Sequence, residues 1–124
     1  MVQKKILIAE DEPQLRKLLV QKFSSSGFTT FGAEDGAVAL HVACKEHPDI
    51  TLLDILMPNM DGMEMLRRLR KDPWGKDAIV ILLTNLGGSE RVVEGMELGV
   101  QEYFIKSDWK LEDIVKKVKE KLGM

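Results

Sequence analysis

Residues 50–58 read ITLLDILMP, a run of mainly apolar side chains interrupted by one acid, Asp54. An acidic side chain is almost never fully buried unless it has a partner. The residues before it, 50–53, show no apolar–polar alternation, which is typical of a strand covered by helices on both faces of a parallel sheet. We therefore expect a central strand that ends at the edge of the sheet, where Asp54 is partly exposed to solvent.

The rest of the chain alternates short strand-like runs with longer helix-like segments. The predicted strands are residues 5–9, 29–33, 50–53, 78–83 and 103–105. The predicted helices are residues 13–25, 36–46, 62–71, 89–98 and 109–122. This alternation predicts an α/β, flavodoxin-like doubly wound fold: five parallel strands in the order 2-1-3-4-5, flanked by five helices. We expect a single domain over residues 1–124, with no output domain within it.

Composition limits the kinds of protein that this chain can be. Its 124 residues, 44% of them hydrophobic, suffice for one core without disulfides. A formal charge of −2 argues against direct binding to nucleic acid or an anionic membrane. The single cysteine, Cys44, permits no intrachain disulfide and suits a reducing cytoplasm. The longest apolar run, residues 78–83, is far shorter than the ~20 residues that span a bilayer, so we expect a cytoplasmic protein.

Polar side chains stand at the ends of four predicted strands. They are Glu10 and Asp11 after the first strand, Asp54 after the third, Thr84 after the fourth and Lys106 after the fifth. In a doubly wound sheet these ends meet at one edge, and ligands bind there at the point where strand order reverses. Three carboxylates close together repel each other, and an oxygen-only ligand set suits Mg²⁺, with Mn²⁺ as a substitute.

A bound cation, a carboxylate, a hydroxyl and a lysine are the groups that phosphoryl transfer requires. A carboxylate can form an acyl phosphate, while metal and lysine neutralise the phosphoryl oxygens. We expect Asp54 to be the nucleophile, because it enters the site opposite Glu10 and Asp11. The alternative is that each group is a polar strand end facing solvent, but the meeting of five such groups on four strand ends argues against it.

The ordered motifs resemble the receiver domain of two-component response regulators, of the chemotaxis-receiver type, over essentially the whole chain. ILIAEDEPQLRKLL (6–19) resembles the family's first strand and acidic turn, and DITLLDILMPNMDGMEML (49–66) its phosphoacceptor strand and following loop. ILLTN (81–85) and EYFIKSD (102–108) resemble the strands that carry its switch hydroxyl and its lysine.

The resemblance implies a role for each site residue. Asp54 would take a phosphoryl group from the phosphohistidine of a sensor histidine kinase or phosphotransfer protein. Asp11, Asp54 and the backbone carbonyl of Leu56 would hold Mg²⁺, with Glu10 acting through water. Such a protein is no enzyme toward other molecules, because it catalyses only its own phosphoryl uptake and loss.

The resemblance also implies a conformational switch. Thr84 and Lys106 would bind the phosphoryl group, and Tyr103 would turn inward as Thr84 moves. The signalling surface would comprise helix 89–98, strand 103–105 and helix 109–122. That surface would bind a downstream effector protein or an output domain, and the protein would be a monomer or a weak dimer through the same surface.

The chain departs from the family pattern beside the site. Ser107 follows Lys106 where a proline with a cis peptide is usual, which leaves the geometry of this loop open. Leu56 and Leu86 are apolar where many relatives carry polar groups, and Asn85 stands where a small residue is common. We expect Asn85, Leu86 and Ser107 to modulate the site, and hypothesise that the two leucines exclude attacking water.

Three other interpretations remain open. A receiver that is never phosphorylated would act as a protein-binding scaffold. A phosphatase resembling the haloacid dehalogenase family would need a second acid two residues after Asp54, where this chain has Leu56. A flavodoxin-type nucleotide module would need a phosphate loop after the first strand, and the acidic residues 10–12 would repel phosphate. The basic run Arg67, Arg68, Arg70 and Lys71 is interpreted as a solvated helix face.

Overall fold

The computed structural model describes residues 3–85 and 90–124, in which strands and helices alternate along the chain. The strands are β1 (Lys5–Ala9), β2 (Thr29–Ala33), β3 (Ile50–Asp54), β4 (Val80–Thr84) and β5 (Glu102–Ile105). The helices are α1 (Pro13–Ser25), α2 (Gly36–Glu46), α3 (Gly62–Lys71), α4 (Glu90–Glu97) and α5 (Leu111–Lys121). Two short 3₁₀ turns are η1 (Gly75–Asp77) and η2 (Lys106–Asp108).

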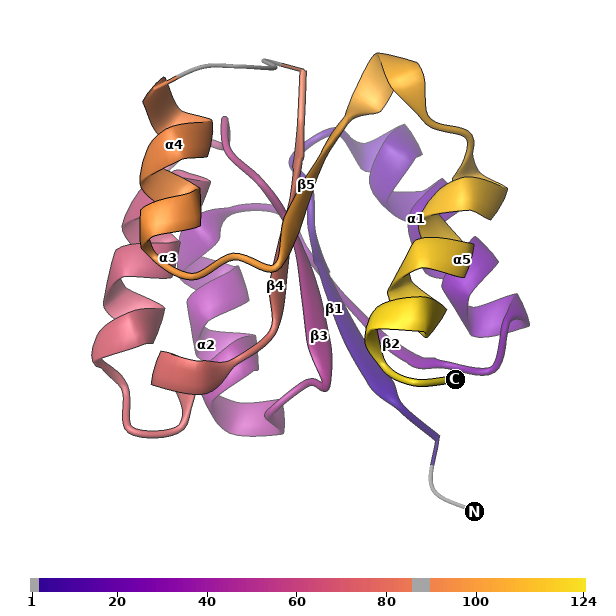
Figure 1. Cartoon of the computed structure of the whole chain (residues 1–124), viewed down its shortest axis with the longest axis horizontal. Coiled ribbons are helices and arrows are strands. Elements are labelled where there is room, and N and C mark those ends of the chain that lie inside the picture. Colours follow the sequence, from indigo (N-terminus) through magenta and orange to yellow (C-terminus); the bar gives the residue numbers. More distant parts are fainter. Residues whose placement is uncertain (1–2, 86–89) are drawn as a thin grey trace.

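The five strands form one parallel sheet in the order β2-β1-β3-β4-β5, which confirms the predicted topology. Helices α2, α3 and α4 cover one face, and α1 and α5 cover the other (Figure 1). Because side chains alternate along a strand, each central strand supplies both layers. On β1, Leu7 belongs to the core on the α2–α3 side, whereas Ile6 and Ile8 belong to the core beside α1 and α5. This two-sided burial explains the unbroken apolar runs of the sequence.

Two elements begin two residues later than predicted, and the other boundaries within the described residues agree to within one residue. β4 begins at Val80 instead of residue 78, because residues 75–77 form η1 and the carbonyl of Ala78 accepts a hydrogen bond from Arg70. α5 begins at Leu111 instead of residue 109, because η2 and an extended Trp109 precede it. The predicted start of the fourth helix, residue 89, lies outside the described residues. The Lys106–Ser107 peptide is trans.

Within residues 3–85 and 90–124, no helix has both the length and the apolar character needed to cross a membrane.

Candidate functional site

The predicted site residues meet where the strands end, at the upper edge of the sheet in Figure 1. Asp54 is the last residue of β3, which lies between β1 and β4 at the centre of the sheet. A hollow of about 440 Å³ lies at this edge. It is lined by Glu10, Asp11, Glu12, Pro13, Asp54, Leu56, Thr84, Asn85 and Lys106. The structure thus brings together the five strand-end groups that the sequence predicted.

The carboxylates of Glu10, Asp11 and Asp54 form a tight cluster, with one oxygen from each lying within 4.8 Å of the others. Asp11 is exposed, whereas Glu10 and Asp54 are only 1% and 5% exposed. The prediction that Asp54 is partly exposed is therefore wrong. Asp54 is buried because β3 has a neighbouring strand on each side: Glu10 follows β1 and Thr84 ends β4. Lys106, which follows β5, contacts the Asp54 carboxylate directly.

Lys106 supplies the positive charge that this cluster needs. Its Nζ lies 2.5 Å from Glu10 Oε1 and 3.2 Å from Asp54 Oδ2, and the lysine side chain is only 13% exposed. The second oxygen of Glu10 accepts a hydrogen bond of 3.1 Å from the backbone N–H of Glu12. Glu10 therefore joins the turn after β1 to the lysine after β5.

Burial and the neighbouring charges shift the pKa values of both Asp54 and Lys106. Burial, and then the charge of Glu10, raise the pKa of Asp54 to about 7, although Lys106 acts in the opposite direction. Burial alone would lower the pKa of Lys106, but its contacts with Glu10 and Asp54 outweigh burial and raise that pKa. Two buried carboxylates thus share one ammonium, and the site favours either a proton or a second cation.

The donor set fits a hard divalent cation. Oε1 of Glu10 is buried and carries the ion pair with Lys106. Oxygen atoms from Asp11 and Asp54 lie beside it, and Asp11 faces solvent. Mg²⁺ prefers oxygen ligands and keeps several waters, which such a half-open cluster allows.

The loop after β3 is fastened to the end of that strand. A β-carbon at Gly62 would collide with the backbone carbonyl oxygen of Asp54, so only glycine permits this approach. The N–H of Gly62 donates to the Ile55 carbonyl at 2.8 Å, and Asp61 caps α3 by accepting from the N–H of Glu64 at 2.9 Å. Sequence reasoning gave Asp61 no role of its own, although an acid followed by Glu64 three residues later is a helix-start signal.

The predicted switch residues share one face of the sheet but differ in exposure, because Tyr103 pairs with Leu82, two residues before Thr84 on β4. Thr84 is buried at the site, whereas Tyr103 on β5 is 37% exposed and lies on the outer surface. Ser107 is exposed in η2, and Asn85 lines the hollow. Leu86 lies outside the described residues.

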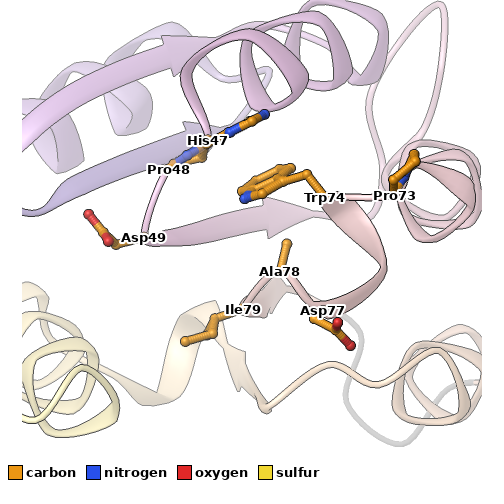
Figure 2. Close-up of a pocket in the computed structure, with 8 residues that line it drawn as sticks. All are labelled: His47, Pro48, Asp49, Pro73, Trp74, Asp77, Ala78 and Ile79. Atoms are coloured by element: carbon orange, nitrogen blue, oxygen red, sulfur yellow. The ribbon is translucent and has the colours of Figure 1, made fainter.

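A second hollow of about 440 Å³ lies at the opposite edge, before β3 and β4 begin (Figure 2). His47 stacks on Trp74 there, with ring centres 4.4 Å apart and planes inclined by 8°. The two rings therefore pack against each other at this edge. The two hollows have equal volumes but different linings. No residue of the acidic cluster lines this second hollow, so it lacks the groups proposed for metal binding.

Comparison with known proteins agrees with this geometry. A family model described as the response regulator receiver domain matches residues 6–119. Sporulation initiation phosphotransferase F of Bacillus subtilis is 39% identical over 106 residues, which cover 86% of this chain and 84% of that protein. Other curated relatives, described as probable transcriptional regulators, are longer, and the match to this chain spans 39% to 43% of their length.

Solved structures show the same architecture. A CheY-like response regulator receiver domain protein from Methanospirillum hungatei superposes with a TM-score of 0.90 at 26% identity, covering 98% of this chain and 95% of that one. The response regulator TrrA of Thermotoga maritima, solved in complex with Mg²⁺ and BeF, gives a TM-score of 0.81 at 32% identity. The latter match covers 94% of this chain and 97% of that one.

Proposed function

Because this chain belongs to the response regulator receiver domain family, we propose that it accepts a phosphoryl group on Asp54 from the phosphohistidine of a partner protein. The partner is a sensor histidine kinase or a phosphotransfer protein. The observation that carries the proposal is the position of Asp54: buried in the hollow, 3.2 Å from Lys106 and clustered with Glu10 and Asp11.

The chemistry is a displacement at phosphorus. A carboxylate oxygen of Asp54 attacks, a P–O bond forms, and the N–P bond breaks as the histidine nitrogen leaves with the electron pair. Lys106 is already beside Asp54, so its ammonium can pair with a phosphoryl oxygen without a large movement. Thr84, at the end of the neighbouring strand, can bind a second phosphoryl oxygen through its hydroxyl.

The acidic cluster would hold Mg²⁺, or Mn²⁺ in its place, which would neutralise negative charge on the transferring group. Asp11, Asp54 and the backbone carbonyl of Leu56 would be direct ligands, with Glu10 acting through water. The exposure of Asp11 supports this assignment, because a ligand at the solvent side lets the ion keep its waters. The TrrA structure with Mg²⁺ and BeF provides a precedent within the family.

The output surface would comprise α4, β5 and α5, as the resemblance implies. Val93, Met96, Tyr103 and Trp109 are large, exposed hydrophobic side chains in or next to these elements, a composition suited to a protein partner. Phosphorylation would move Thr84 toward the phosphoryl group and Tyr103 inward, which changes the shape of the surface. An effector protein or an output domain would bind the changed surface, and a weak dimer would use the same surface.

Two alternative functions receive less support. A phosphatase acting on other molecules needs a second acid near the nucleophile, and Leu56, which lines the hollow, offers none. We therefore propose no enzymatic activity beyond the chain's own phosphoryl uptake and loss. A scaffold that is never phosphorylated would not require the buried Glu10–Lys106–Asp54 contacts, whose assembly is costly.

Intact-mass measurement after incubation with a small phosphodonor and Mg²⁺ tests the proposal. We expect one added phosphoryl group, absent in Asp54→Asn and absent when the metal is chelated. Asp77→Asn is the matched control, because Asp77 is an exposed acid at the opposite edge of the sheet. A wild-type protein that gains no mass with several donors would instead support the scaffold.

A further inference from the structure

Three arginine contacts join residues 61–71, which include α3, to α4 and to Leu98, the residue after it. We call these contacts the arginine seam. They are Arg91 Nη1–Asp61 Oδ2 at 3.1 Å, Arg67 Nη1–Glu94 Oε2 at 2.5 Å and Arg70 Nε–Leu98 O at 2.7 Å. On α4 the side chains of Arg91 and Glu94 lie three residues apart, the spacing of one helical face, whereas Leu98 contributes a backbone carbonyl just after the helix. The interpretation of the basic run as a solvated face is therefore wrong for Arg70, whose guanidinium donates to backbone carbonyls, whereas 41% of the Arg67 side chain remains exposed.

The seam is strongest at the carboxyl end of α4. Besides Leu98, Arg70 donates to the carbonyl of Gly99 at 3.2 Å and to the carbonyls of Gly75 and Ala78 at 2.8 Å each. Hydrogen bonds from a charged donor are the strong ones, and a cation is also favourable beside the carbonyl end of a helix. Arg70 thus fixes this end of α4 to the turn before β4.

The seam is weakest at the amino end of α4. The side chains of Arg91 and Asp61 are 44% and 32% exposed, and they share one contact of 3.1 Å. An exposed ion pair of this kind contributes little to stability and is weakened by salt. The amino end of α4 can therefore be released while the carboxyl end stays in place.

The weak end is also the end next to the phosphoacceptor. Asp61 uses one carboxylate oxygen to cap α3 and the other to hold Arg91. The next residue, Gly62, packs directly against the backbone carbonyl of Asp54. A displacement of the strand end would therefore reach Asp61 first and Arg91 next.

We propose that the Arg91–Asp61 ion pair is a latch that holds the amino end of α4 in the unphosphorylated conformer, and that Arg70 is the fixed point about which α4 turns when the latch opens. This inference rests on the proposed function, because phosphorylation of Asp54 is what opens the latch. A contact present in only one of two conformers biases the equilibrium toward that conformer. Loss of the latch should therefore favour the phosphorylated conformer.

The first test needs neither metal nor phosphodonor. Amide hydrogen exchange of residues 93–97 is compared in the wild type, Arg91→Gln, Asp61→Asn and the control Arg68→Gln. Asparagine retains the ability to cap α3, and Arg68 forms a somewhat more exposed pair with Glu64 that does not reach α4. We expect these amides to exchange about two- to five-fold faster in both latch variants, the range of an exposed ion pair. Exchange no faster than in Arg68→Gln overturns the latch.

The second test measures binding of beryllofluoride, a phosphoryl mimic, in the presence of Mg²⁺. We expect Arg91→Gln to bind beryllofluoride about two- to five-fold more tightly than the wild type. The double variant Arg91→Gln/Asp61→Asn should show no larger increase in affinity than either single variant, because both substitutions break the same ion pair. Unchanged or weaker binding in Arg91→Gln overturns the latch. If the wild type binds no beryllofluoride, the proposed function fails instead, and hydrogen exchange alone decides whether the latch exists.

Discussion

Lys106 Nζ lies closer to Glu10, at 2.5 Å, than to Asp54, the proposed phosphoacceptor, at 3.2 Å. The lysine therefore acts as an internal counter-ion for the acidic cluster before any metal binds. Glutamate has the reach for this contact, since it is one methylene longer than aspartate. Lysine and a divalent cation must then share the same carboxylates.

The first prediction is that Lys106→Gln binds Mg²⁺ more tightly than the wild type, by about three- to tenfold. Removal of the ammonium leaves carboxylate repulsion that only the metal can relieve, and a factor of ten corresponds to about 1.4 kcal/mol. Calorimetric titration with Mg²⁺ measures the change. Lys116→Gln is the control, because Lys116 is exposed on α5. Equal or weaker affinity in Lys106→Gln would show that Glu10 and Lys106 are not coupled to the metal.

The second prediction concerns the pH dependence of stability in the presence of a chelator. The pKa of Asp54 is raised from 3.8 to about 7, so folding favours its protonated form. The stability that this proton contributes is present below pH 4 and is lost as pH rises through 7. Asparagine does not ionise, so Asp54→Asn does not lose stability in this way as pH rises. We therefore expect the variant to be more stable than the wild type by about 1–4 kcal/mol at pH 8, and by much less at pH 5.

Denaturant unfolding at the two pH values, with chelator in the buffer, provides the measurement. Asp77→Asn should shift stability equally at both pH values. An advantage for Asp54→Asn that shrinks as pH rises would contradict the raised pKa. Mg²⁺ should stabilise the wild type and leave Asp54→Asn nearly unchanged, since the variant lacks one proposed ligand.

The topology could be predicted from the sequence because unbroken apolar runs such as those of β1, β3 and β4 indicate strands that are buried on both faces of a parallel sheet. The sequence also predicted that the strand-end side chains would meet, for a related reason: parallel strands bring their ends to one edge. It failed for Asp54, because the burial of a strand end depends on side chains that arrive from β1, β4 and β5. It also failed for Arg70, whose partners are backbone carbonyls that no pattern of side chains reveals.

The third prediction concerns Gly62, whose missing side chain lets the β3–α3 loop lie against Asp54. Gly62→Ala should destabilise the fold by about 1–3 kcal/mol, because the new methyl group meets a backbone carbonyl that cannot move aside. Gly32→Ala is the matched control, since a β-carbon there meets only side-chain atoms at 3.5 Å or more. Denaturant unfolding of both variants gives the comparison, and equal stabilities would contradict the close approach at Gly62.

The last prediction concerns Leu56, which lines the hollow and is half-exposed. Its apolar side chain offers no hydrogen bond to a water molecule attacking the acyl phosphate, whereas asparagine could hold and orient one. We expect Leu56→Asn to shorten the half-life of the phosphorylated protein threefold or more, a barrier change of at least about 0.6 kcal/mol. Leu18→Asn is the control, because Leu18 is equally exposed on α1 and does not line this hollow. The half-life is followed by intact mass after removal of the donor, and an unchanged value in Leu56→Asn would show that water reaches the phosphoryl group by another route.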